Sequence, residues 1–154
     1  MLRAVVRGRR EKGGVVMSTE ETSAMAMRWM DEVWQKTSPA AIAGLLSHNL
    51  TFSYGASGTK HDREAYKRGV KDMRAGLPDI EFTTEGMVVE RDRAAVFWKG
   101  RGTHGGGFVG LAPAGKRAVR DCINIIRVAG GRTVEEVGQM NGMEIMQTLG
   151  APAP

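Results

Sequence analysis

The sequence predicts a single α+β domain in which helices come first and an antiparallel sheet follows. Up to Leu77 most apolar residues recur at helical spacing, whereas after Asp79 they alternate with polar residues, as they do in strands. Turns at 90–93 and 129–131 divide this second part into separate strands. A block of helices followed by a block of strands is typical of α+β proteins.

Three helices and one early strand are predicted in the first half. The segment Ser18-Thr19-Glu20-Glu21 has the pattern of a capping box at the start of the first helix. Ser38-Pro39 provides an N-cap and a first-turn proline for the second helix. Alternation over 50–54 predicts a strand, and the third helix extends from Asp62 to Leu77, where Pro78 prevents its continuation.

Four longer strands and a short closing helix are predicted in the second half. The strands cover Ile80–Glu90, Ala94–His104, Arg117–Val128 and Thr133–Asn141. Apolar spacing over 143–149 predicts the closing helix, and the Ala-Pro repeat at 151–154 predicts a flexible tail. The predicted domain therefore covers 18–150.

Length and composition limit the class of protein. The chain has 154 residues and a mass of 16.7 kDa, enough for one core without disulfides or metals. Its single cysteine, Cys122, excludes an internal disulfide and fits a reducing compartment, so we expect a cytoplasmic location. No apolar run approaches the ~18 residues of a membrane span, and no membrane partner is expected.

The formal net charge of +5 is concentrated at the N-terminus. Residues 1–16 carry five basic side chains and one acidic one, and the rest of the chain is close to neutral. The codons for Lys12-Gly13-Gly14 can form a bacterial ribosome-binding sequence a few codons before Met17. We therefore expect translation to start at Met17, residues 1–17 to be a disordered or wrongly assigned extension, and no nucleic acid to bind.

The most informative segment is the glycine-rich stretch from Trp98 to Lys116. Counting back from His104 in steps of two places it on the same strand face as Trp98 and Val96. Glycines inside a strand usually mark a bend, a bulge or the close approach of another group. The stretch therefore predicts a sheet that curves around a pocket.

The order Thr-His-x-Gly-x-Phe-x-Gly-x-x-Pro-x-Gly-Lys over 103–116 resembles that of the SnoaL-like polyketide cyclases, a family of the nuclear transport factor 2-like superfamily. Further similarity extends from about Thr22 to Gly150. The resemblance implies a cone of curved antiparallel sheet, closed by three N-terminal helices around an apolar pocket. It also implies a homodimer and the cofactor-independent cyclisation of small polyketides in bacterial natural product biosynthesis.

Two strands carry candidate catalytic residues. His104 has the side chain whose ordinary pKa permits proton transfer near neutral pH, although a lone histidine on an apolar face is more often structural. The resemblance places Cys122 and Asn124 in the cavity, where the Asn124 amide can donate to a substrate carbonyl or enolate. Alternatively, Asn124 satisfies a neighbouring backbone group, and Cys122 is a small core residue.

The segment from Glu135 to Asn141 departs from the family. Family members usually carry Glu-x-Trp-Asp-x-x-Asp here and use an aspartate as general acid and base. Gly138 and Asn141 occupy the two aspartate positions, and neither can transfer a proton. Glu136 shares a predicted strand face with Gly138 and is a candidate substitute, unless it is a solvated residue at the sheet edge beside Glu135.

Several aromatic and small residues are expected to line the pocket and bind a flat ligand, although the aromatic ones would suit an ordinary core equally well. They are Trp29, Trp34, Phe52, Tyr54, Trp98, Cys122, Gly138 and Met140. The glycine-rich stretch lacks the Gly-Lys-Ser/Thr ending of a phosphate loop. The three histidines are too scattered to form a metal site, so no metal or cofactor is expected.

Two functions remain open at this point. The first is a tailoring enzyme that closes or rearranges a ring of a hydrophobic polyketide-like molecule, using His104, Asn124, and Asn141 or Glu136. The second is a noncatalytic small-molecule-binding or dimeric accessory protein that has kept the fold and lost the acid. The absent aspartates favour the second function, whereas the Thr103-His104 motif and Asn124 favour the first.

Overall fold

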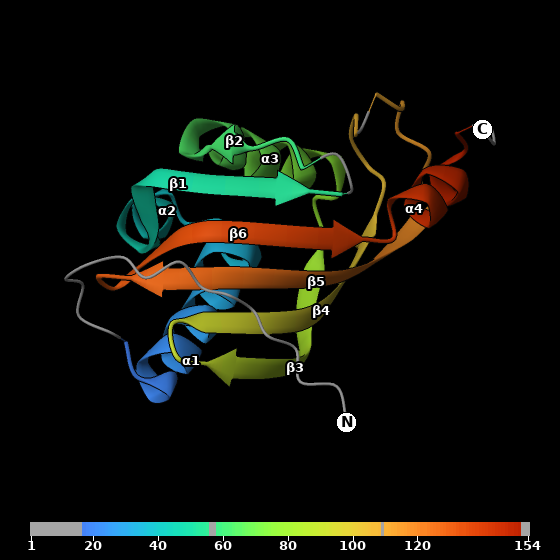
Figure 1. The fold of residues 1–154 in the computed structure, drawn as a ribbon. Helices are drawn as coiled ribbons and strands as arrows, with labels where there is room; N and C mark the ends of the chain where they lie inside the picture. Colours follow the sequence, from blue (N-terminus) through green and yellow to red (C-terminus); the bar gives the residue numbers. More distant parts are fainter. Residues whose placement is uncertain (1–16, 56–57, 109, 152–154) are drawn as a thin grey trace.

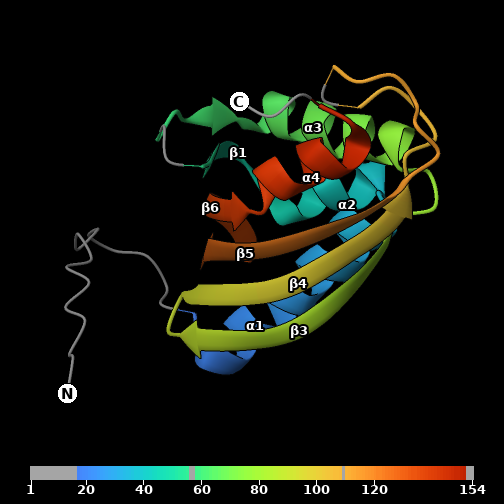
Figure 2. The same cartoon turned by 90° about the vertical axis from the view of Figure 1, so that its right-hand side faces the viewer.

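The computed structural model describes residues 17–55, 58–108 and 110–151, which form helices packed on a curved sheet (Figures 1 and 2). This arrangement confirms the predicted α+β class. The predicted N-terminal extension, apart from Met17, and most of the predicted tail lie outside the described residues.

The three predicted N-terminal helices are confirmed, and they begin at the predicted caps. They are α1 (Thr19–Arg28), α2 (Pro39–Leu45) and α3 (Arg63–Gly76). Ser18 Oγ accepts from the Glu21 amide at 3.2 Å, and the Glu21 carboxylate accepts from the Ser18 amide at 2.8 Å. The side chains of Ser38 and Asp62 cap α2 and α3.

The first helix continues as a π-helical segment, η1 (Trp29–Gln35), which the periodicity did not predict. Near its end the carbonyl groups of Trp34 and Gln35 accept from Arg74 Nη2 at 2.9 and 2.7 Å. Arg74 Nη1 also donates to the Ile80 carbonyl at 2.8 Å. Arg74 therefore supplies donors that a helix end lacks, and it fastens η1 to the start of the sheet.

Within the described residues the sheet has six strands, in the order β2-β1-β6-β5-β4-β3. They are β1 (Leu46–Tyr54), β2 (His61–Asp62), β3 (Glu81–Glu90), β4 (Arg93–Thr103), β5 (Arg117–Ala129) and β6 (Arg132–Met140). The four strands of the second half match their predicted ranges to within one residue at each end. In contrast, β1 begins earlier than predicted, and the short β2 was not predicted.

One strand pair differs from the expected antiparallel arrangement. Strand β1 is parallel to β6, whereas the other strand pairs are antiparallel. Parallel neighbours need a long connection, and here β2 to β5 and α3 lie between the two strands in the chain. The alternation of residues identified both strands but contained no information about which strands pair.

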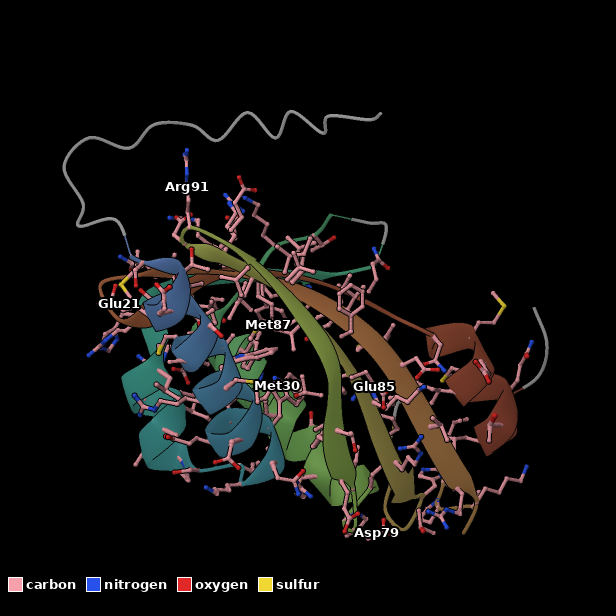
Figure 3. All side chains as sticks on the ribbon, turned by 90° about the horizontal axis from the view of Figure 1, so that it is seen from below. Glu21, Met30, Asp79, Glu85, Met87 and Arg91 are labelled. Carbon is pink, nitrogen blue, oxygen red and sulfur yellow. The ribbon has the colours of Figure 1, made fainter. Side chains whose placement is uncertain are left out.

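Helices α1, α2 and α3 cover one face of the sheet, and strands β3, β4 and β5 curve around them (Figure 2). In Figure 3, Met30 of η1 and Met87 of β3 lie between helices and sheet, whereas Glu85 lies on the outer face, 3.9 Å from Lys99 Nζ. Helix α4 (Gly142–Leu149) lies at the end of β6 (Figure 1). The core therefore occupies the concave side of the sheet.

The glycine-rich stretch packs tightly against the end of α3. The Gly106 amide donates to the Gly76 carbonyl at 3.2 Å, and a Cβ at Gly106 would collide with the Ala75 carbonyl oxygen. Asp79 accepts from the amide and the hydroxyl of Thr103, at 2.6 and 2.8 Å. These glycines thus mark a close backbone approach, one of the alternatives that the sequence left open.

The outer face of the sheet carries exposed apolar side chains, which we call the outer apolar patch. Its members are between 42 and 45 % exposed and are Phe97, Val119, Ile125 and Val137. Charged pairs border the patch, among them Arg127 with Glu135 at 3.4 Å. The sheet therefore presents apolar surface on both faces, of which the helices cover one.

Candidate functional site

The inner faces of β5 and β6 carry polar side chains into the apolar core. Alternation along β5 directs Arg120, Cys122 and Asn124 inward, and each is less than a tenth exposed. On β6, Glu136 points to the same side and is fully buried. Asn124 is paired with Gly138, two residues from Glu136, so the strand register brings the amide and the carboxylate together.

Hydrogen bonds join Glu136, Tyr54, Asn124 and Trp98 into a group that we call the Glu136 network. Glu136 Oε1 accepts from the Tyr54 hydroxyl and from Asn124 Nδ2, each at 2.6 Å. Asn124 Nδ2 also donates to the Tyr54 oxygen at 2.9 Å, and its Oδ1 accepts from Trp98 Nε1 at 2.7 Å. Asn124 thus donates through Nδ2 and accepts through Oδ1, which fixes the orientation of this side chain.

The other carboxylate oxygen of Glu136, Oε2, is buried and has no hydrogen-bond partner among the described residues. Burial disfavours the ionised form and raises the pKa of Glu136 to about 7, although the hydroxyl groups of Tyr54 and Tyr66 and the Asn124 amide oppose this shift. Near neutral pH both protonation states are therefore populated. The alternative of a solvated edge residue fits Glu135, which pairs with Arg127, and not Glu136.

Two tyrosines near Glu136 remain protonated. Burial, reinforced by the Glu136 carboxylate, raises the pKa of Tyr54 and of Tyr66 well above its usual value. The Tyr66 hydroxyl accepts from Trp29 Nε1 at 3.0 Å. Tyr66 was not among the site residues predicted from the sequence, because helical spacing does not show which groups a helix face contacts.

The aromatic residues predicted to line the pocket form one cluster around the Glu136 network. Trp34 lies at its centre, with the ring centroids of Trp29, Tyr66 and Trp98 at 5.7 to 6.1 Å. Phe52 packs against Tyr66, with ring centroids 5.0 Å apart. The fold therefore brings the predicted aromatic residues together from helices and strands that are distant in the chain.

The Tyr54 ring occupies the space next to Gly138. A Cβ placed on Gly138 would collide with Tyr54 Cε1 and would lie 2.7 Å from Asn124 Nδ2. Gly138 therefore borders a packed ring and not the open pocket that the sequence predicted. Tyr54, which donates to Glu136, would have to move if an aspartate were present at position 138.

Asn141 lies outside the Glu136 network, at the end of β6. Its Oδ1 accepts from the Asp121 amide at 2.9 Å, and its Nδ2 donates to the Val119 carbonyl at 3.2 Å and to Glu144 at 3.0 Å. These bonds attach the start of α4 to β5. Asn141 is therefore not brought together with Asn124 and Glu136, and its amide is engaged in joining α4 to β5.

His104 does not join the Glu136 network either. It follows β4 eight residues after Val96, the partner of Asn124 in the sheet, which corresponds to about 26 Å of extended strand. The ring is fully buried, and neither of its nitrogens has a hydrogen-bond partner among the described residues. The Phe108 ring lies 6.5 Å away, and the His104 amide donates to the Lys116 carbonyl at 2.9 Å. His104 thus belongs to the closure of the glycine-rich stretch.

Arg120 is an inner residue that the sequence analysis did not single out. Its Nη1 and Nη2 donate to Met73 Sδ at 2.7 Å and to Met140 Sδ at 3.2 Å, and its guanidinium lies 5.7 Å from the Trp98 ring centroid. Arg120 lies two residues before Cys122 on the same strand face, so alternation along the strand could have indicated that Arg120 also points inward.

Burial raises the pKa of the Cys122 thiol to about 11, and this group stays protonated.

The described part of the chain shows no group of three or more His, Cys, Asp or Glu side chains that could hold a metal ion. No helix within the described ranges is long and apolar enough to cross a membrane. A surface groove of about 690 Å³ lies between α3 and the glycine-rich stretch, but no member of the Glu136 network lines it.

Replacing Gly138 by alanine should destabilise the protein, because the new methyl group collides with the Tyr54 ring and the Asn124 amide. Overpacking of this kind typically costs about 1–3 kcal/mol, which should lower the melting temperature by roughly 3–10 °C in scanning calorimetry. Gly69→Ala in α3 is the control, since its surroundings are open and alanine favours a helix. An unchanged melting temperature of Gly138→Ala would contradict the position of Tyr54.

Replacing Glu136 by glutamine should change how stability depends on pH. The pKa of Glu136 is about 7 in the folded state and near 4.5 when unfolded, so the folded state binds more protons between these values. The free energy of unfolding of the parent should therefore fall, by about 3 kcal/mol, as pH rises from about 4.5 to about 7. The glutamine side chain does not titrate, so Glu136→Gln should match the parent near pH 4 and exceed its stability above pH 7 in urea denaturation.

The neighbouring substitution Glu135→Gln tests whether this difference comes from burial. Glu135 lies at the surface beside Arg93 and Arg127, so Glu135→Gln should retain the pH dependence of the parent. Parallel stability curves for the parent and Glu136→Gln would show that Glu136 does not titrate in the predicted range.

Solved structures with the same fold include two proposed polyketide cyclases and a proposed hydroxylase. A proposed SnoaL-like polyketide cyclase from Jannaschia sp. CCS1 is 18 % identical, with a TM-score of 0.78 over 95 % of this chain and 99 % of that one. AclR, a proposed hydroxylase from Streptomyces galilaeus, is 21 % identical, with a TM-score of 0.77 over 86 % and 98 %. IdmH, a proposed polyketide cyclase from Streptomyces antibioticus, is 24 % identical, with a TM-score of 0.72 over 84 % and 99 %. These similarities establish that the chain shares the fold of these proteins.

The sequence comparison identifies the family. No curated protein matches the chain at a significant level. The family model described as SnoaL-like polyketide cyclase matches residues 24–149, which include every strand and the sites discussed above. The chain therefore belongs to the SnoaL-like polyketide cyclase family.

Proposed function

We propose that this protein binds a hydrophobic, polyketide-like molecule and catalyses a cofactor-independent ring closure or rearrangement in which Glu136 transfers a proton. The observation that carries the proposal is a fully buried carboxylate, with a pKa of about 7, whose Oε2 has no hydrogen-bond partner within the described part of the chain. A general acid or base works best when its pKa lies near the working pH. Glu136 meets this condition, whereas Gly138 and Asn141, at the usual aspartate positions, cannot titrate.

Each member of the Glu136 network has a distinct role in this mechanism. The ionised Glu136 removes a proton from a carbon next to a substrate carbonyl, and the C–H bonding electrons pass into the enolate. The enolate carbon then attacks a second carbonyl carbon of the substrate, the π electrons of that C=O bond move onto its oxygen, and protonated Glu136 returns the proton to this oxygen. Tyr54 and Asn124 bind Oε1 and leave Oε2 for the substrate, while Trp98 orients Asn124. Tyr54, Asn124 and Trp98 are therefore positioning residues.

A noncatalytic ligand-binding or accessory role is the second candidate. It is supported by the packing of the Tyr54 ring against Gly138, because this ring fills the space that a substrate could occupy next to the network. Under this alternative, Glu136 only orders the core, and its substitution changes stability without affecting a reaction.

A generic proton-transfer probe can test Glu136 without knowledge of the natural substrate. The probe is 5-nitrobenzisoxazole, in which removal of the C3 proton by a base breaks the ring N–O bond and releases a coloured cyanophenolate. If ionised Glu136 is the base, the rate should rise as pH passes through about 7. Glu136→Gln should lose at least ~10²-fold, the typical contribution of a general base.

Two matched variants control this experiment. Glu135→Gln should keep the parent rate, because Glu135 lies at the surface. His104→Asn should also keep most of the rate, since His104 lies outside the network, although loss of the buried ring should lower the melting temperature. A parent rate that Glu136→Gln leaves unchanged would exclude the proposed role and favour the accessory protein.

We also propose that the protein is a cytoplasmic homodimer in which a second copy covers the outer apolar patch. Apolar side chains on both faces of a sheet favour a second covering layer, and the helices supply only one. Introducing charge with Ile125→Lys should shift the mass measured by light scattering towards the monomer. Met27→Lys, a similarly exposed position on α1, is the control and should leave the dimer intact. A monomeric parent at tens of micromolar would refute the dimer.

A further inference from the structure

Arg120 is buried without an anionic partner. Its side chain is 6 % exposed, and no carboxylate of the described residues lies within salt-bridge distance. The adjacent carboxylate, Asp121, projects from the other face of β5, 3.8 Å from Lys99 Nζ. A guanidinium does not lose its proton in a protein, so the core contains a permanent and uncompensated positive charge.

The groups that Arg120 contacts are weak substitutes for an anion. Its terminal nitrogens donate to two thioether sulfurs, of Met73 and Met140, and its Nε has no partner among the described residues. Thioether sulfur is a weak acceptor. By comparison, Arg74 donates to three backbone carbonyl groups, and Arg63 donates to the Ala43 carbonyl and contacts a His48 ring nitrogen. Arg120 therefore lacks the oxygen acceptors that stabilise those two arginines.

Arg120 lies on the same inner face of the sheet as the Glu136 network and contacts one of its members, Trp98. It lies on the same face of β5 as Asn124 and four residues away, which is about 13 Å of strand. Trp98 is shared, because it donates to Asn124 and its ring lies under the Arg120 guanidinium. A flat molecule that reaches Glu136 along this face would have its far end close to Arg120.

We propose that Arg120 binds an acidic group of the ligand, a carboxylate or an ionised phenol or enol, and thereby selects anionic aromatic or polyketide-like molecules. This inference rests on the proposed binding function of the same interior and adds the chemical class of the ligand. A carboxylate accepts two parallel, charge-assisted hydrogen bonds from a guanidinium and replaces the thioether contacts. Met73 and Met140 then adjust their flexible side chains around the bound group.

The first test compares two probes that differ in charge and have the same ring system. The probes are 2-naphthoate and its neutral analogue 2-naphthamide, with binding to the full chain followed by calorimetry and by tryptophan fluorescence at pH 6. We expect naphthoate to bind the parent roughly tenfold more tightly or better, since hydrogen bonds to charged groups are the stronger ones. Arg120→Met should lose this preference, and Arg120→Lys should keep part of it. Equal or absent binding of the two probes by the parent would overturn the proposal.

The second test measures the unliganded protein. Arg120→Met places a third thioether beside Met73 and Met140 and removes the buried charge, so its melting temperature should be equal to or above that of the parent. Arg74→Met is the control and should melt lower, because three carbonyl groups lose their donor. A lower melting temperature for Arg120→Met would identify Arg120 as a structural residue and overturn the proposal.

Failure of this inference can be distinguished from failure of the proposed catalysis. Glu136→Gln should retain the preference for naphthoate, because Glu136 lies away from the acidic group of the ligand. The benzisoxazole rate of the parent depends on the base alone, so a parent that converts this probe but shows no preference for naphthoate would refute the inference about Arg120 and leave the proposed catalysis intact. Loss of the naphthoate preference in Glu136→Gln would show that the anion does not bind at Arg120.

Discussion

The burial of the Glu136 carboxylate is the constraint on which the arrangement of this core depends. A carboxylate that leaves water must be protonated or supplied with hydrogen bonds. Tyr54 and Asn124 supply two bonds to a single oxygen, and Trp98 holds Asn124 in place. These residues come from β1, β5 and β4, so the network exists only when the strands around β6 are assembled in the observed order.

The parallel pairing of β1 with β6 determines which groups lie beside Gly138. This pairing places Tyr54 opposite Gly138, and the ring lies where a side chain at 138 would project. A side chain at position 138 would require the Tyr54 ring to move. The buried carboxylate of Glu136 lies two residues earlier on the same inner face of β6, where the Tyr54 hydroxyl donates to it.

The core also contains two ionisable groups that do not neutralise each other. Glu136 lies at the middle of the inner face with a pKa near neutrality, and Arg120 lies further along β5 with thioether contacts. Hydrophobic replacements of such groups are often neutral or stabilising, so stability alone does not account for their presence. A ligand that donates a proton at one end and carries negative charge at the other would account for both.

The sequence by itself determined the α+β class and the helix starts, because caps and periodicity depend on neighbours in the chain. Ser18, Ser38 and Asp62 capped their helices as expected. Alternation also placed Cys122 and Asn124 on one face of their strand, but both faces were partly apolar, and only the resemblance implied which one faced inward. Only the tertiary structure showed that Glu136 is buried although Glu135 is not. It also placed His104 and Asn141 outside the Glu136 network. Finally, it showed that the Tyr54 ring fills the space next to Gly138. These properties depend on strand pairing and on contacts between distant segments. The pattern of residues along one strand carries no information about either of them.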